Sequence, residues 1–265
     1  MNTVRSQDGT TIAFDRVGTG PALILVDGAL CHRKFGPSAA LAKQLADRFT
    51  VFTYDRRGRG ESSDTQPYSV DREVEDLSAL IAAAGGSAYV LGVSSGAALA
   101  LEAANRRLPI TKLAMYESPF IVDATRTPIG EEYLPQLKQM IAEGRRGDAV
   151  SHFMNAVQVP RVFILMMRLM PSWKKLTAVA PTLVYDITIV ERYQRGNPLP
   201  ADRWSSVQAP TLVMDGGKSP AWMRNAQRAI AGVVPGAQTL TLAGQTHMVK
   251  ATALAPAVKS FFLAA

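Results

Sequence analysis

Short apolar runs alternate with longer amphipathic segments along most of the chain. Strand-like residues 3–6 and 11–17 flank Asp8 and Gly9, a pair that favours a tight hairpin turn. The apolar run ALILV at 22–26 has the length of a strand buried on both faces. Further strands are expected at 50–54, 88–93, 112–116, 211–215 and 237–242, and helices at 38–47, 69–84, 95–105, 221–231 and 251–263. This alternation predicts an α/β fold with a mostly parallel, doubly wound eight-stranded sheet.

One long segment interrupts the alternation. Residues 120–205 show helical patterning without buried strands, and they hold half of the chain's ten methionines. We therefore expect a core domain built from two parts, 1–119 and 206–265, with a helical insertion between them.

The composition is that of an ordinary globular chain, because 47% of the 265 residues are hydrophobic and 19% are charged. The formal net charge of +7 comes from Lys and Arg residues scattered among acidic neighbours, with no basic stripe interleaved with aromatics. We expect a solvated basic surface and no nucleic-acid partner. The single cysteine, Cys31, excludes an intrachain disulfide and a thiolate metal cluster.

The sequence also bears on location and partners. Its first residues lack the apolar core of a signal peptide. The uncharged stretch 77–101 is long enough to span a bilayer, but Gly85, Gly86 and a later glycine-rich turn interrupt it. We expect a cytoplasmic monomer or homodimer with a small-molecule partner, no membrane partner, no metal and no organic cofactor.

The strongest chemical signal is the segment GVSSG at 92–96, between a predicted buried strand and a predicted helix. A tight strand-to-helix turn needs small flanking residues and exposes its central side chain at the carboxyl edge of the sheet. The central residue here is Ser94. This setting predicts a nucleophilic serine rather than a plain glycine-rich turn.

Four motifs in order make the chain resemble the α/β-hydrolase superfamily, in its serine-nucleophile branch. DRRGRGES at 55–62 looks like the D-x-R-G-x-G-x-S loop of that superfamily, and GQTH at 244–247 looks like its late histidine loop. VDGA at 26–29 stands where the superfamily carries His-Gly. The resemblance covers essentially the whole chain. It implies the α/β-hydrolase fold, with the insertion as a helical cap, and catalysis by a serine, a histidine and an acid.

His247 is the expected base for Ser94, because it alone of the three histidines follows the last predicted strand. Without a base, a serine hydroxyl is a poor nucleophile at neutral pH. His152 lies in the insertion. His32 follows the 26–29 segment, where it lies either at the mouth of the substrate pocket or on the surface.

The carboxylate expected to pair with His247 is not where most members of the superfamily carry it. In the commonest pattern, this residue is an aspartate that follows the strand corresponding to 211–215. Ser219 stands at that position, which leaves two carboxylates as candidates. Glu117 ends the strand after the Ser94 helix and is preferred. Asp215, inside or at the end of its own strand, is the alternative, and a structural role for Glu117 at the cap hinge stays open. The chain is similar to the zearalenone lactonases in four features. These are the G-x-S-S-G turn, Asp-Gly in place of His-Gly, the Glu-x-Pro strand end and the absence of an acid in the later loop.

The resemblance implies an oxyanion hole formed by the backbone N–H groups of Ala29 and Ser95. Gly28 permits the close backbone approach that this hole needs, and it is expected to contact substrate. Asp27 beside the hole is unusual, since a negative charge there opposes an oxyanion. We expect its side chain to turn away and to bond to Arg56 or Arg57.

The insertion is expected to form an adaptable apolar pocket over Ser94. The residues expected to line this pocket are Phe163, Met166, Met167, Met170 and Trp173. Packing within the core of the cap itself is an equally good interpretation of any one of them.

Together these features predict a carboxylic-ester hydrolase, of esterase or lactonase type, that forms an acyl-enzyme on Ser94 with an apolar small molecule. Hydrolysis of C–C bonds or thioesters by the same residues is one alternative. A non-catalytic, ligand-binding member of the superfamily is the other. Arg56, Arg57 and Arg59 are expected to be structural.

Overall fold

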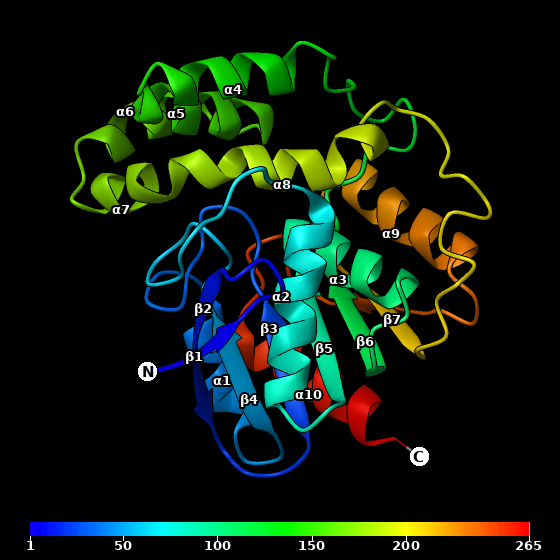
Figure 1. The fold of residues 1–265 in the computed structure, drawn as a ribbon. Helices are drawn as coiled ribbons and strands as arrows, with labels where there is room; N and C mark the ends of the chain where they lie inside the picture. The colour runs from blue at the N-terminus through cyan, green and yellow to red at the C-terminus, as the bar shows by residue number, and fades with distance from the viewer. Residues whose placement is uncertain (265) are drawn as a thin grey trace.

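The computed structural model describes residues 1–264 of the chain. Its strands form a single sheet in the order β1-β2-β4-β3-β5-β6-β7-β8 (Figure 1). The β1–β2 and β2–β4 pairs are antiparallel and the other pairs are parallel. The predicted mostly parallel, eight-stranded sheet is confirmed. The strands are β1 (Asn2–Arg5), β2 (Thr11–Val17), β3 (Ala22–Val26), β4 (Thr50–Tyr54), β5 (Ala88–Val93), β6 (Ile110–Tyr116), β7 (Thr211–Gly216) and β8 (Gln238–Leu242).

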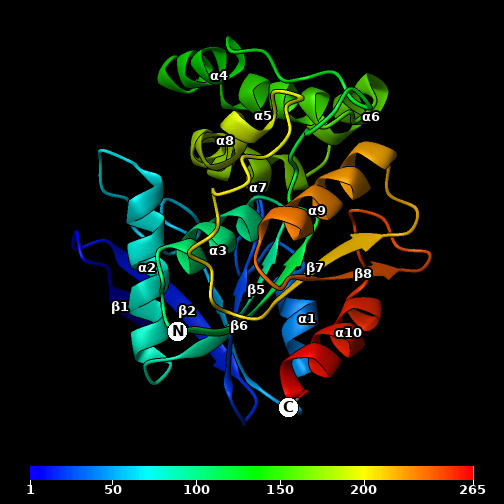
Figure 2. The ribbon, with the colours of Figure 1, turned by 90° about the vertical axis from the view of Figure 1, so that its right-hand side faces the viewer.

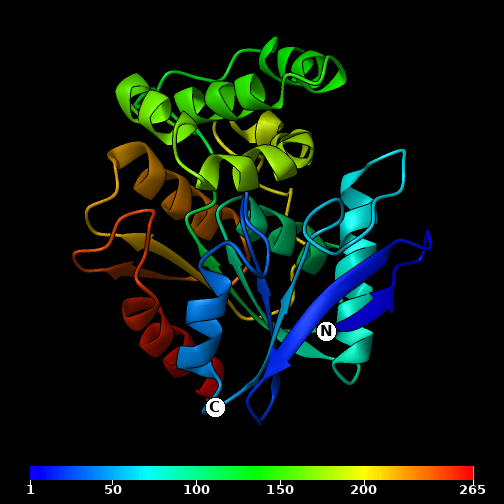
Figure 3. The ribbon, with the colours of Figure 1, turned by 90° about the vertical axis from the view of Figure 1, so that its left-hand side faces the viewer.

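Two layers of helices cover the two faces of the sheet (Figure 2, Figure 3). One layer consists of α1 (Ser38–Leu45) and α10 (Ala251–Leu263), and the other of α2 (Val70–Ala83), α3 (Ser95–Asn105) and α9 (Ala221–Val233). Strand β3 shows why both are needed. Its Leu23 and Leu25 belong to the apolar cluster under α1 and α10, whereas Ile24 and Val26 belong to the cluster under α2, α3 and α9.

A helical cap stands over one end of the sheet (Figure 1). Its helices all lie within residues 120–205, the segment expected to be the insertion. They are α4 (Tyr133–Ala142), α5 (Arg146–Ala156), α6 (Arg161–Arg168), α7 (Ser172–Val179) and α8 (Leu183–Val190), with the short 3₁₀ helices η1 (Ala180–Thr182) and η2 (Glu191–Tyr193). This end is the carboxyl end of the parallel strands, because Ser95, two residues after the end of β5, bonds to Asp186 of α8.

Buried ion pairs attach the cap to the sheet. Asp186 is nearly inaccessible to solvent, and its two carboxylate oxygens lie 2.7 Å from Arg56 Nη1 and 2.7 Å from Arg59 Nη2. Buried charges are tolerated only when they are paired and hydrogen-bonded. These pairs therefore hold α8 at a defined position over the loop that follows β4.

The ends of the elements differ from expectation by a few residues, as element boundaries commonly do. Helix α1 ends at Leu45 rather than at residue 47, and β6 begins at Ile110 rather than at residue 112. In the described part of the chain, 1–264, no helix combines the length and the apolar character needed to cross a membrane.

Candidate active site

Ser94 occupies a sharp turn between β5 and α3. Its backbone has φ of 57° and ψ of −127°, a combination that non-glycine residues rarely adopt and that marks functional sites. The turn is tightly enclosed: a Cβ added at Gly92 would lie 2.5 Å from Ala97 Cα, and one added at Gly96 would lie 2.2 Å from the Val26 carbonyl oxygen. Only glycine fits at these two positions, which is the geometric reason for the GVSSG pattern.

His247 lies in the loop between β8 and α10, and its Nδ1 is 2.9 Å from Glu117 Oε2. Glu117 has no exposed surface, whereas the imidazole is partly exposed. With the carboxylate ionised, Nδ1 keeps its proton and donates a hydrogen bond to Glu117. Nε2 is then left as a proton acceptor on the other side of the ring.

The backbone fixes the other oxygen of Glu117. Gly216 N–H, at the end of β7, donates to Glu117 Oε1 at 2.7 Å. Glu117 itself has φ of 50°, which turns the chain sharply at the end of β6. The carboxylate therefore lies between two neighbouring strand ends and the imidazole.

Asp215, the alternative acid, lies within β7 and is buried. Its Oδ1 has no hydrogen-bond partner among residues 1–264, and the imidazole of His247 pairs with Glu117 instead. Of the two candidate carboxylates, the structure thus brings Glu117 to His247.

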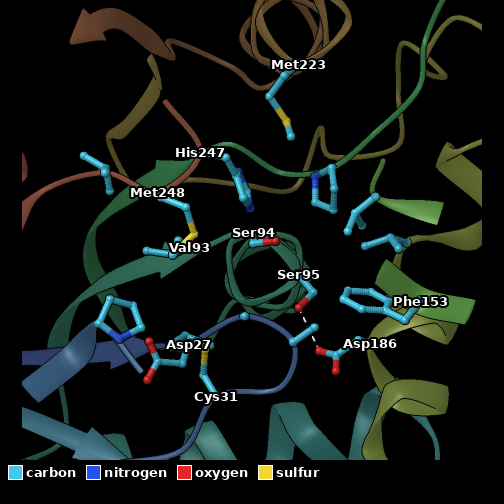
Figure 4. A pocket seen from close by; sticks show the side chains of 18 of the residues that line it. Asp27, Cys31, Val93, Ser94, Ser95, Phe153, Asp186, Met223, His247 and Met248 are labelled. Atoms are coloured by element: carbon cyan, nitrogen blue, oxygen red, sulfur yellow. Dashed lines mark hydrogen bonds between the residues drawn. The ribbon is translucent and has the colours of Figure 1, made fainter. Parts of the chain in front are cut away.

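Ser94 and His247 line one cavity of about 500 Å³ between the sheet and the cap. Figure 4 shows the imidazole pointing toward the Ser94 turn from the β8–α10 loop. Ser94, His247 and Glu117 come from segments far apart in the sequence, and the parallel strand ends bring them together.

Ala29 and Ser95 also line the cavity. Ser95 is the first residue of α3, so its N–H has no intrahelical acceptor. Gly28 packs directly against the serine, because a Cβ added there would lie 2.9 Å from Ser94 Cβ. The loop after β3 and the start of α3 therefore approach each other beside Ser94, as an oxyanion hole requires.

A polar network behind this region was not expected from the sequence. Ser95 Oγ donates to Asp186 Oδ1 at 2.7 Å, the dashed contact in Figure 4. Arg59 Nη1 donates to the Gly28 carbonyl at 2.7 Å, and Arg56 Nη1 donates to the Asp27 carbonyl at 3.3 Å. The signal for Asp186 was present in the sequence: it is a lone carboxylate in the apolar run LVYDITIV, and a charge inside a buried helix must be paired.

The Asp27 side chain turns away from Ser94 (Figure 4), as expected, but the expected partner was wrong. Arg56 bonds to the Asp27 backbone carbonyl, and Arg57 pairs with Asp76 and Asp8. Burial raises the pKa of the Asp27 carboxyl from 3.8 to about 6, although a hydrogen bond from Ser38 and the charges of Arg59 and Arg56 act to lower it.

The cavity wall is mostly apolar, but the predicted cap residues do not form it. None of Phe163, Met166, Met167, Met170 and Trp173 lines the cavity, so that prediction was wrong. Phe163, Met166 and Met170 are more than half exposed on the cap, and Met167 and Trp173 pack against the cap's own core. Instead, α5, the loop after it and α9 supply the wall, with residues such as Phe153, Val157, Val159 and Met223.

His32 does not line the cavity either. The centre of its ring lies 6.0 Å from the centre of the Phe35 ring. Its Nδ1 is buried without a hydrogen-bond partner among the described residues. Burial lowers the pKa of His32 below its ordinary value. Within residues 1–264, no group of three or more His, Cys, Asp or Glu side chains is arranged to hold a metal ion.

Comparison with known proteins gives consistent matches. A model described as the alpha/beta hydrolase family matches residues 10–257. The crystal structure of an alpha/beta hydrolase from Sphaerobacter thermophilus DSM 20745 is 50% identical, with a TM-score of 0.91, over 98% of this chain and 100% of that one. A hydrolase from Pseudomonas aeruginosa PA01 is 22% identical with a TM-score of 0.73, over 99% and 98% of the two chains, and shows the fold alone.

Among curated relatives, the pimeloyl-[acyl-carrier protein] methyl ester esterase of Xanthomonas campestris pv. campestris (strain B100) is 34% identical over 138 residues. That alignment covers 51% of this chain and 52% of the esterase. The chain therefore matches about half the length of the curated relatives to which it is similar.

The shifted Asp27 pKa predicts how stability depends on pH. Because the folded protein retains the Asp27 proton up to about pH 6, it binds more protons than the unfolded chain between 3.8 and about 6. The contribution of Asp27 to the free energy of unfolding therefore falls as pH rises through this window. Asp27→Asn removes the titration and preserves the shape. We expect its free energy of unfolding, relative to wild type, to rise by about 1 to 3 kcal/mol between about pH 4 and about pH 7.

Urea unfolding of both proteins at several pH values measures this difference. A difference that stays constant with pH, or one that falls as pH rises, would contradict the proposed environment of Asp27.

Proposed function

The chain belongs to the alpha/beta hydrolase family, and on that premise we propose that it is a serine hydrolase that cleaves carboxylic esters or lactones of apolar small molecules. One observation supports this best: a buried carboxylate, Glu117, holds the Nδ1 side of His247 at 2.9 Å, in the cavity that Ser94 also lines. This is the arrangement that activates a serine hydroxyl for acyl transfer.

In the first half of the reaction, His247 Nε2 takes the proton of the Ser94 hydroxyl while Oγ bonds to the carbonyl carbon of the substrate. The carbonyl oxygen becomes an oxyanion, which the N–H groups of Ala29 and Ser95 stabilise. The bond from carbon to the alcohol oxygen then breaks. His247 donates its proton to the leaving alkoxide, and an acyl-enzyme remains.

In the second half, a water molecule gives a proton to His247 and adds to the acyl carbon. The bond to Ser94 Oγ breaks, the proton returns to Oγ, and the acid is released. Glu117 keeps the imidazole in one tautomer and stabilises the imidazolium that forms in each half. Because Gly216 N–H and His247 both bond to Glu117, the carboxylate is fixed before substrate arrives.

The apolar wall of the cavity supports a small apolar substrate. The half-length similarity to a methyl ester esterase is consistent with an ester as the scissile group. A lactone places the same carbonyl and leaving oxygen in one ring, so the same residues serve both substrate classes.

The direct test is a panel of p-nitrophenyl esters and lactones assayed with wild type and Ser94→Ala. Wild type is expected to hydrolyse members of the panel, and kcat for Ser94→Ala is expected to fall by at least about 1,000-fold, because its attacking atom is gone. Ser205→Ala, which changes an exposed serine, is the matched control. Hydrolysis that survives in Ser94→Ala, or a wild type silent on every ester and lactone, refutes the proposal.

The packing of Gly28 against Ser94 yields a second prediction. In Gly28→Ala the new methyl group lies too close to Ser94 Cβ, so either the serine or the oxyanion loop must shift. We expect kcat/KM for the best ester to fall by about 10- to 100-fold, since small misplacements of reacting groups are costly. Gly232→Ala, on α9 with open space around it, controls for the substitution itself. Equal activity of both variants would show that the serine does not depend on the 26–29 loop.

A further inference from the structure

Arg126 lies between β6 and α4, the first helix of the cap, and it contributes to the wall of the same cavity. It is 8% exposed, and its guanidinium carbon lies 4.0 Å from the centre of the Trp222 ring. Stacking on an aromatic face holds a guanidinium plane in one orientation. Arg126 is therefore a fixed, nearly buried cation on the substrate side of the protein.

This cation has no carboxylate partner. Within residues 1–264, the one hydrogen bond of the guanidinium runs from Nη2 to the Ala156 carbonyl at the end of α5, and no acidic side chain lies within ion-pair distance. Burial alone lowers the pKa of Arg126. The partial negative charge of a helix C-terminus offsets only part of a full positive charge.

The other deeply buried arginines show how unusual this is. Arg33, Arg56, Arg57 and Arg59 are each paired with at least one carboxylate. The fold thus neutralises these buried cations from its own residues. Arg126, the one that lines the cavity wall, is left available to a charge from outside.

Two further donors in the wall are also unpaired. Tyr133 Oη and Trp222 Nε1 are buried and have no hydrogen-bond partner among the described residues, and both residues line the cavity. Two carboxylates line the cavity: Asp186 is already neutralised by Arg56 and Arg59, and the Asp27 side chain turns away from Ser94. Buried donors without acceptors are costly, so a ligand that supplies acceptor oxygens gains affinity here.

We propose that Arg126 binds a carboxylate of the substrate, so that the preferred esters or lactones carry a second, ionised acid group apart from the scissile carbonyl. A guanidinium matches a carboxylate with two parallel hydrogen bonds, and water exclusion strengthens the pair. This proposal rests on the proposed hydrolase function, and it changes the preferred substrate from a neutral apolar ester or lactone to one whose otherwise apolar body carries a single carboxylate.

The test compares matched p-nitrophenyl esters, each pair having an acyl chain that ends either in a methyl group or in a carboxylate, over a series of chain lengths. Wild type is expected to give a kcat/KM at least about 10-fold higher for the carboxylate member at the best length. In Arg126→Met this ratio is expected to fall to about one or below, and Arg126→Lys should restore part of it. Arg228→Met, which removes an exposed arginine from α9, should keep the wild-type ratio.

Calorimetry with monomethyl glutarate, which carries one carboxylate and one ester, on Ser94→Ala separates this proposal from the hydrolase proposal. Binding that disappears in the Ser94→Ala, Arg126→Met double variant supports the carboxylate site even if no ester is hydrolysed. Hydrolysis of neutral esters without a preference for the carboxylate member, or a preference that survives Arg126→Met, overturns the proposal and leaves the hydrolase function intact. If no ester is hydrolysed and monomethyl glutarate does not bind, both proposals fail.

Discussion

The hydrogen bonds of Glu117 organise the site. Its carboxylate is fully enclosed, and it joins the end of β6 to the end of β7 through Gly216 N–H and to the β8–α10 loop through His247. Hydrogen bonds to an ionised acceptor in such surroundings are strong, and leaving the carboxylate unpaired would be costly. The bond to Glu117 orients His247 within the β8–α10 loop, which the Tyr116 hydroxyl and Lys218 N–H also hold through the carbonyls of Thr246 and Gln245. The proposed activation of Ser94 depends on that position.

A second constraint acts from the other side of Ser94. Asp186 of the cap bonds at once to Ser95 and to the two arginines that hold the carbonyls of Asp27 and Gly28. The proposed oxyanion hole is thus built from core residues whose orientation depends on a cap residue. The cap that encloses the substrate and the backbone that stabilises the developing charge are parts of one buried network.

The sequence predicted the sheet, its flanking helices and the Ser94 turn because these depend on local periodicity and on glycine sterics, both visible in a short window. Glu117 was preferred over Asp215 because it ends the strand after the Ser94 helix, a position similar to that of the acid in the zearalenone lactonases, whereas Asp215 lies inside or at the end of its own strand. The structure places Glu117 against His247. The prediction of which cap residues line the cavity was wrong for a physical reason. Which face of a short helix turns inward depends on tertiary packing, and the local sequence does not determine it. In α6, Ile164 is the residue that is buried, while Phe163 and Met166 face outward. The position of Arg126 in the cavity wall could not be predicted, because the residue lies in an irregular segment without a periodic pattern or a motif.

The most direct test of the central claim is the rate at which a fluorophosphonate inactivates the protein, since this needs no knowledge of the substrate. The account predicts a covalent adduct on Ser94 in wild type and a second-order rate constant at least about 100-fold lower in Glu117→Gln, whose amide cannot stabilise the imidazolium. Asp215→Asn should react within about fivefold of wild type. A wild-type protein that does not react, or an Asp215→Asn variant that loses more reactivity than Glu117→Gln, would contradict the assignment of Glu117 as the residue that supports His247.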